Sequence, residues 1–338
     1  MNRNSIFIIA EAGVNHNGDM ELAHQLIEVA AEAGADAVKF QTFKAKELVT
    51  AQTQKATYQK KTSGADESQY SMLKKLELDT VAHTDLIAHA RKYNIEFLST
   101  PFDADSLDML LKLGISTIKV PSGEITNLPY LHHAGSKGIP IIMSTGMTTL
   151  QEVEAAVAIL VKSGTPATDI TLLHCNTQYP TPLVDANLRA METLALAFPD
   201  CSVGYSDHTP GISCPIAAAA MGASVIEKHF TLDKTMEGPD HAASLDPEEL
   251  TAMVSGIRDI EKALGDGTKQ PSPSELENIN IARRFLVAAT PIASGEPFTE
   301  HNVAAKRTGR GGISPMRWDE IMQKKSPKDF HPGEVIEL

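Results

Sequence analysis

Cysteine is scarce in this chain: its 338 residues include only three, Cys175, Cys201 and Cys214. No two of them form a Cys-x-x-Cys pair, so the sequence offers neither a disulfide framework nor the usual thiolate motif for zinc or redox chemistry. Each is expected to be a small buried hydrophobic residue. The composition therefore favours a protein of a reducing compartment, which we expect to be the cytoplasm.

Long hydrophobic runs and an excess of basic residues are also missing. The longest apolar stretch, residues 216–226, is far shorter than the roughly 20 residues of a membrane span. The amino-terminal apolar run is too short for a signal peptide. With 43 acidic and 30 basic residues the net charge is −13, which argues against nucleic acid or a membrane as a partner. An anionic substrate would need a local cluster of cations.

Short β-rich runs alternate with longer amphipathic stretches along most of the chain. Each run has little polar alternation, as strands buried on both faces do. No Gly-rich dinucleotide motif or Walker loop follows any of them. Eight such units predict an α/β fold, a (β/α)8 TIM barrel rather than an open doubly wound sheet. The runs cover residues 7–10, 37–40, 96–99, 117–120, 140–144, 170–174, 202–205 and 224–228.

The composition changes after a helical pattern over residues 247–264, where a Gly-, Pro- and Ser-rich stretch begins. We predict a barrel domain over 1–268, a linker over 269–281 and a small, mostly irregular domain over 282–338. This last segment has nine Lys and Arg against seven Asp and Glu, whereas the rest of the chain has 21 against 36. A slightly basic cap is thus attached to an acidic barrel. The polar interval 44–79 is expected to extend over the barrel mouth.

Reactive side chains in such a barrel stand at the carboxyl ends of the strands. The predicted strand ends here are rich in polar residues, more than a purely structural barrel needs, and Asp240 lies in the loop beyond the last of them. In strand order they are Glu11 and Asn15; Lys39 and Gln41; Ser99 and Thr100; Lys119, Ser122 and Glu124; Ser144 and Thr145; His174, Asn176 and Tyr179; Ser206, Asp207 and His208; and Glu227, Lys228 and His229.

Two histidines at neighbouring strand ends, His208 and His229, are placed so that their imidazoles can converge on one point. A pair of histidines leaves several coordination positions open, which suits a divalent ion that also holds water or substrate rather than a closed structural zinc. Two rim histidines that only form hydrogen bonds are the alternative.

Two lysines, Lys39 and Lys119, also stand at strand ends, among hydroxyl residues from other strands. Ammonium groups beside hydroxyls and nearby glycines suit a ligand that carries a phosphate and a carboxylate. A Schiff-base lysine is a rival interpretation. A lysine paired only with Glu11 or Glu124 is the structural alternative.

Motifs along nearly the whole chain, in the expected order, resemble those of the sialic acid synthases. They are IIAEAGVNHNG (8–18), VKFQT (38–42), LSTPFD (98–103), KVPSGE (119–124), MSTGM (143–147), YPTP (179–182), GYSDHT (204–209) and EKHFTLDKTMEGPDH (227–241). The segment KRTGRGGIS (306–314) resembles the small antifreeze-like (SAF) domain that ends these enzymes.

The resemblance implies condensation of phosphoenolpyruvate with an N-acylated mannosamine-type sugar to give a nine-carbon sugar acid and phosphate. It implies a divalent metal, Mn²⁺ or Mg²⁺, held by His208 and His229. The roles it implies for the other residues are as follows: Lys39, Thr100, Lys119, Ser122, Ser206 and Asn176 hold phosphoenolpyruvate; Gln41, Tyr179, Asp240 and Arg307 contact the sugar; and Glu11, Glu124 and Glu227 orient groups and move protons, with Glu11 as first choice for the general acid/base.

Two departures from the N-acetylneuraminate-making members bear on the acceptor sugar. Those members often have His where this chain has Phe40, and Asn where it has Thr177. Phe40, QKATYQ (54–59) and SGEITNLPYL (122–131) look more like the legionaminate branch, whose sugar is a 6-deoxy-2,4-diacetamido mannose derivative. An apolar Phe40 near the sugar would suit an acceptor that lacks a hydroxyl. We expect N,N'-diacetyllegionaminate as product, with N-acetylneuraminate as the alternative.

Three rival functions remain open from the residues. A phosphoenolpyruvate synthase acting on a phosphorylated sugar would need further cations, and no Arg cluster stands at these strand ends. A class I aldolase would use a Schiff-base lysine. The third rival is a carbohydrate- or ice-binding protein with an inert barrel.

The family resemblance also predicts a domain-swapped homodimer. In it, Arg307 from the basic cap of one subunit would complete the site of the other, and the opposite net charges of cap and barrel favour their attraction.

Overall fold

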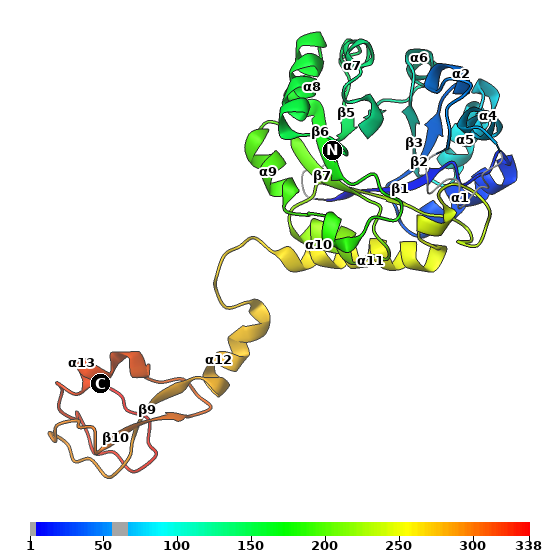
Figure 1. Cartoon of the computed structure of the whole chain (residues 1–338). Coiled ribbons are helices and arrows are strands. Elements are labelled where there is room, and N and C mark those ends of the chain that lie inside the picture. Colours follow the sequence, from blue (N-terminus) through cyan, green and yellow to red (C-terminus); the bar gives the residue numbers. More distant parts are fainter. Residues whose placement is uncertain (1–4, 56–66) are drawn as a thin grey trace. The chain divides into compact units, whose positions relative to one another are not determined.

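The computed structural model describes residues 5–55 and 67–338. The chain divides into two compact units, Met1–Gly265 and Asp266–Leu338, and each is described by itself (Figure 1). None of the helices in the described part of the chain combines the length and the apolar character that a bilayer crossing requires.

The first unit is built on eight parallel strands that follow one another around a barrel (Figure 1). Hydrogen-bonded neighbours run in the order β3-β2-β1-β8-β7-β6-β5-β4, and the end strands β3 and β4 lie side by side. The prediction of a (β/α)8 barrel is confirmed. The strands are β1 (Phe7–Gly13), β2 (Ala37–Thr42), β3 (Glu96–Pro101), β4 (Ile118–Val120), β5 (Ile141–Ser144), β6 (Ile170–Cys175), β7 (Ser202–Asp207) and β8 (Val225–His229).

Helices connect the strands on the outside of the barrel, and side-chain caps fix where several of them begin. Asp19 accepts a hydrogen bond at the start of α1, and Thr149 and Glu152 form a capping box at the start of α8. The helices are α1 (Met20–Glu32), α2 (Ala45–Leu48), α4 (Gln69–Leu76), α5 (Thr80–Lys92), α6 (Ala104–Lys112), α7 (Leu128–Gly135), α8 (Leu150–Ser163), α9 (Ala190–Ala197), α10 (Ser213–Ala220) and α11 (Pro247–Leu264).

The polar interval 44–79 contributes α2 and α4 in its described part. Residues 56–66 lie outside the described residues, and with them most of the QKATYQ motif. What this interval covers at the barrel mouth therefore stays a prediction.

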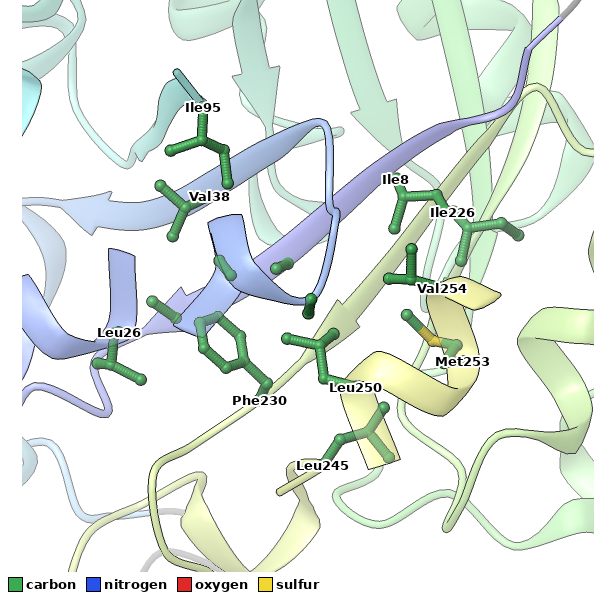
Figure 2. Packing of buried hydrophobic residues seen from close by; sticks show 14 of the residues in the cluster. Ile8, Leu26, Val38, Ile95, Ile226, Phe230, Leu245, Leu250, Met253 and Val254 are labelled. Atoms are coloured by element: carbon green, nitrogen blue, oxygen red, sulfur yellow. The ribbon is translucent and has the colours of Figure 1, made fainter. Parts of the chain in front are cut away.

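Apolar side chains fill two layers, one inside the barrel and one between the strands and the helices. The inner layer, at the amino-terminal half, consists of Ile9, Ala37, Leu98, Ile142, Leu173 and Val225. In the outer layer, Leu250, Met253 and Val254 of α11 pack near Ile8 and Ile226 of the strands (Figure 2). Successive residues of a strand point to opposite faces. Each strand therefore supplies both layers.

The second unit is small and has its own apolar core, which includes Leu286, Ile292, Phe298 and Phe330. Its strands β9 (Arg284–Ala288) and β10 (Val303–Arg307) pair antiparallel, and a short helix, α13 (Trp318–Ile321), follows. The helix α12 (Leu276–Ala282) overlaps the segment predicted as linker, 269–281, and ends one residue beyond it. Arg307 ends β10 opposite Arg284 and is exposed.

Candidate active site

The carboxyl ends of the strands bring inward-pointing polar side chains together inside the barrel mouth. In register, Glu11 of β1 lies beside Lys39 of β2 and His229 of β8, and Ser206 of β7 lies beside Glu227 of β8. Lys119 of β4 faces them. All of these side chains are buried, so their charges interact in a low-dielectric environment where Coulomb forces are strong.

Two lysines and two glutamates form the centre of the mouth. Lys39 Nζ lies 2.5 Å from Glu11 Oε2 and 3.7 Å from Glu227 Oε2, and Lys119 Nζ lies 3.7 Å from Glu227 Oε1. Lys39 also donates to the Thr100 hydroxyl at 2.8 Å. Lys39 is therefore held by a carboxylate and a hydroxyl. Glu227 lies 3.7 Å from each lysine, which is longer than the contact between Lys39 and Glu11.

Hydroxyl groups complete this lysine–glutamate centre. Lys119 donates to Ser144 Oγ at 2.6 Å, and Ser206 donates to Glu227 Oε1 at 2.9 Å. Ser122 accepts from the Gly146 amide at 3.0 Å and lies 3.3 Å from the Cys175 sulfur. Hydroxyls beside ammonium groups are well suited to hold oxygen atoms of an anionic ligand.

The two glutamates differ in their affinity for a proton. Burial raises the pKa of Glu11 to about 7, partly offset by Lys39 and increased by Glu227. Burial acts on Glu227 in the same direction, but Lys119, Lys39 and the Ser206 hydroxyl outweigh it and leave its pKa below the usual value. Glu11 is thus the carboxyl group that can take up and release a proton near neutral pH, while Glu227 stays ionised.

His208 and His229 converge as the strand order predicted. Their ring centroids are 5.4 Å apart, and the Tyr179 hydroxyl lies 2.9 Å from His208 Nε2. His208 Nδ1 donates to the main-chain oxygen of Asn176, which leaves the Nε2 lone pair for another partner. Burial lowers the pKa of His208 to about 4 and lowers that of His229 strongly, so both rings are neutral.

Neutral imidazoles with an unprotonated nitrogen are what a divalent metal needs, and at His208 the ion would take the place of the Tyr179 hydroxyl. His229 Nδ1 is buried and has no hydrogen-bond partner among the described residues. Gly13, at φ +54°, leaves room beside it, because a side chain there would lie 3.2 Å from the His229 ring. No third metal-binding side chain completes a coordination group in the described part of the chain. The pair fits an ion that takes its remaining ligands from water or substrate.

Among the remaining predicted residues, Gln41 reaches this centre, whereas the side chains of Glu124 and Asn176 contact residues close to them in sequence. Gln41 Nε2 is 3.5 Å from Glu11 Oε1. Asp240 is buried, burial raises its pKa to about 6, and its carboxyl accepts no hydrogen bond from the described residues. Glu124 accepts from Asn127 Nδ2 at 2.5 Å, at the start of α7. Asn176 accepts from the Gln178 amide at 2.8 Å, so its side chain holds its own loop.

One prediction about the site is wrong. Phe40 lies between Lys39 and Gln41, which both point into the mouth, so its ring points outward into the layer beneath the helices. It is fully buried there and stacks on Phe97 at a centroid distance of 5.5 Å. Phe40 therefore does not face a bound sugar.

Ser144 contacts the lysine–glutamate centre, although residue type and spacing do not separate it from Thr145 at the end of the fifth strand. The 2.6 Å hydrogen bond from Lys119 distinguishes Ser144 from Thr145, whose hydroxyl donates to the main-chain oxygen of Leu173.

The cysteines agree in part with the expectation that each is buried. Cys175 and Cys214 are buried, while Cys201 is partly exposed.

Comparisons with known proteins agree with this geometry. The NeuB family matches residues 26–269, and the SAF domain matches residues 283–338. An N,N'-diacetyllegionaminic acid synthase of Campylobacter jejuni is 55% identical over 97% of this chain and 98% of its own length. A protein of the same name from Legionella pneumophila is 48% identical over 98% and 93%.

A solved structure gives the same result. The crystal structure of an N-acetylneuraminic acid synthetase from Leptospira borgpetersenii, in complex with citrate, superimposes with a TM-score of 0.73 at 38% identity, covering 82% of this chain and 91% of that one. The resemblance predicted from the motifs is confirmed. The chain belongs to the NeuB family and carries a carboxyl-terminal SAF domain.

Proposed function

We propose that this protein condenses phosphoenolpyruvate with a 6-deoxy-2,4-diacetamido mannose derivative to give N,N'-diacetyllegionaminate and phosphate, in the cytoplasm. The observation that carries the proposal is the lysine–glutamate centre beside two neutral histidines. It combines an anion site with a place for a carbonyl-polarising ion. The two relatives of that name, at 55% and 48% identity, support the choice of sugar.

Phosphoenolpyruvate would lie on the two lysines. Its carboxylate and phosphate need several cationic and hydrogen-bonding donors within one small volume. Lys39 and Lys119 supply the charge from opposite sides of Glu227. Thr100 and Ser144 accept hydrogen bonds from the two lysines, and Ser206 donates to Glu227. Ser122 and Asn176 would add further contacts to the bound substrate.

The acceptor sugar would lie against Gln41, Tyr179 and Asp240, with its aldehyde toward the histidines. Mn²⁺ or Mg²⁺ on His208 and His229 would polarise the aldehyde oxygen and hold the sugar in place. The buried carboxyl group of Asp240, which accepts no hydrogen bond from the described residues, suits a sugar hydroxyl or amide N–H.

The bond-forming step joins C3 of phosphoenolpyruvate to the aldehyde carbon of the sugar. The aldehyde oxygen gains a proton and becomes a hydroxyl, and C2 of the enol ester becomes electrophilic. Water adds at C2 and loses a proton, and the tetrahedral intermediate expels phosphate to leave the 2-keto acid. Glu11, with a pKa of about 7, is placed to exchange these protons. Glu227 and Glu124 would orient donors around it.

The test offers phosphoenolpyruvate with each of two sugars, the 2,4-diacetamido sugar and N-acetylmannosamine, and identifies the products by mass. We expect phosphate release with both reagents present and a higher kcat/KM with the diacetamido sugar. A higher kcat/KM with N-acetylmannosamine would favour the N-acetylneuraminate alternative. Lysine adducts trapped by borohydride, with no loss of activity to a chelator, would favour a class I aldolase instead.

We further propose that the SAF domain closes the site of a second subunit through Arg307. The side chain of Arg307 is exposed on β10, where an arginine is free to reach the N-acyl group of a sugar. The test mixes two inactive variants, Arg307→Ala and Glu11→Gln, under subunit exchange. With reach in trans, each mixed dimer has one site without a lesion, and about a quarter of the wild-type activity returns after random pairing. No activity after confirmed exchange would refute the swapped arrangement.

A further inference from the structure

A second pair of buried charges lies on the outer face of the same strands that carry the histidines. Asp207 of β7 and Lys228 of β8 are neighbours in register, and both are fully buried. They point outward because Ser206 and Glu227, the residues before them, line the mouth. Asp207 directly precedes His208, and Lys228 directly precedes His229. No substrate can reach this pair from the mouth.

Every polar atom of this outer pair is engaged. Lys228 Nζ lies 2.5 Å from Asp207 Oδ2 and also donates to the main-chain oxygen of Thr209. Asp207 accepts from the Tyr205 hydroxyl at 2.9 Å and from the Thr209 amide at 3.1 Å and hydroxyl at 3.0 Å. The two residues that flank His208 are thus tied to each other and to β8.

Stability alone does not explain the pair. Its surroundings are apolar: α10 packs on β7 and β8, and Tyr205, Ala218 and Phe230 belong to the adjoining hydrophobic layer. Removing two charges from water is costly, and well-packed hydrophobic residues in place of a buried ion pair are often as stable or more so. What an ion pair adds here is a fixed geometry between two strands.

We propose that Asp207 and Lys228 are positioning residues that set the distance and orientation between the imidazoles of His208 and His229. The ion pair fixes the two strands at the level where both histidines leave them. The bonds to Thr209 fix the chain on the far side of His208. Without the Asp207–Lys228 ion pair and its bonds to Thr209, both imidazole rings are still present. Their separation, however, is no longer the one that an ion bound to both of them requires. The proposal rests on the metal site of the proposed function.

The informative variant is the double replacement Asp207→Leu/Lys228→Met, because either single replacement leaves a buried charge without its partner. Mn²⁺ is titrated into the protein and followed by calorimetry, without substrate. We expect the double variant to have a Tm at or above that of the wild type and an affinity for Mn²⁺ at least about tenfold weaker, as found when groups supporting metal ligands are removed.

A matched control is the pair Asp36 and Arg258 at the amino-terminal end of the barrel. Arg258 Nη2 lies 2.7 Å from Asp36 Oδ2, which also accepts from the Ile8 amide. The double variant Asp36→Leu/Arg258→Met should bind Mn²⁺ as the wild type does.

In the Asp207→Leu/Lys228→Met variant, kcat should fall and should recover as the Mn²⁺ concentration rises, while the KM for phosphoenolpyruvate stays unchanged. A purely structural role would not produce that recovery.

Wild-type affinity for Mn²⁺ in a folded Asp207→Leu/Lys228→Met variant would overturn the proposal. So would a wild-type protein that binds no Mn²⁺, since there would be no site to position. Should the variant fail to fold, the neutral polar pair Asp207→Asn/Lys228→Gln, whose shorter Gln side chain cannot restore the ion pair, takes its place, with the same expected loss of affinity and the same refuting result. Failure of the proposed function is separate: it shows as His208-dependent Mn²⁺ binding without any synthase product.

Discussion

Buried charged side chains lie on both the outer and the inner face of the barrel wall, near the carboxyl ends of β7 and β8. The two groups differ in how closely their charges are paired. On the outer face, Asp207 and Lys228 are completely paired, at 2.5 Å, and each has its remaining bonds to neighbouring groups. On the inner face, Glu227 lies 3.7 Å from both Lys39 and Lys119, and His229 Nδ1 has no partner among the described residues. Both groups are buried. The outer pair has close partners throughout, whereas the inner group combines one close ion pair, Lys39 with Glu11, with the longer separations around Glu227.

The difference separates a structural ion pair from a binding site. A buried charge without a close ion-pair partner is costly. The proposed function accounts for that cost at Glu227 and Lys119, because the bound substrate would supply further interactions. Two lysines and two glutamates also balance each other. An incoming anion adds negative charge, and Glu11, with a pKa of about 7, is the group that can compensate by taking up a proton.

The largest effect is expected when a positive charge is removed from the group of buried charges on the inner face. In Lys119→Met, phosphoenolpyruvate loses one of its two ammonium groups, and we expect kcat/KM to fall by about 10²–10³, the usual effect of removing one group that stabilises a developing or transferred charge. Phosphate release measures it. Lys262→Met is the control, because Lys262 is exposed on α11 and pairs with Asp259 there. Wild-type kcat/KM in Lys119→Met would contradict the assignment of the anion site.

A second way is to remove the metal and its ligands. Dialysis against a chelator should reduce turnover by about 100-fold, and added Mn²⁺ or Mg²⁺ should restore it. His208→Ala and His229→Ala should not recover with added metal, yet should keep the wild-type circular dichroism, because the mouth is not the packed core. His132→Ala is the control: His132 is on α7 and bonds to Ser163. Full activity in either variant of the mouth would refute the metal assignment.

Much of this contrast could be read from the sequence, and part of it could not. The eight apolar runs gave the barrel, since strands buried on both faces have that pattern. The positions of the strand ends in the sequence predicted that Lys39, Lys119, His208 and His229 lie at the barrel mouth. The expectation that failed concerns the face on which a residue lies. The family resemblance predicts Phe40 near the sugar, where related enzymes often have His, whereas strand alternation turns its ring outward.

Properties that depend on burial and exact neighbours were also out of reach. Glu11 and Glu227 both point into the mouth from strands, and their different pKa directions arise from their neighbours, namely the two lysines and, at Glu227, the Ser206 hydroxyl. Glu124 looked equivalent to both, but its neighbour Asn127 binds it at the start of a helix. Residue type and spacing place such groups near each other without ranking them.

The smallest expected effects come from two adjacent residues that differ only in the face they occupy. Phe40 stacks on Phe97 in the outer layer, whereas Gln41 reaches toward Glu11 in the mouth. Phe40→Leu should lower the free energy of unfolding by about 1–3 kcal/mol, measured with urea, and leave the ratio of kcat/KM for the two sugars unchanged. Gln41→Ala should leave unfolding nearly unchanged and raise the KM for the sugar several-fold. If Phe40→Leu instead alters the preference between the sugars, acceptor choice is transmitted through the barrel wall, and the separation of the two faces does not hold.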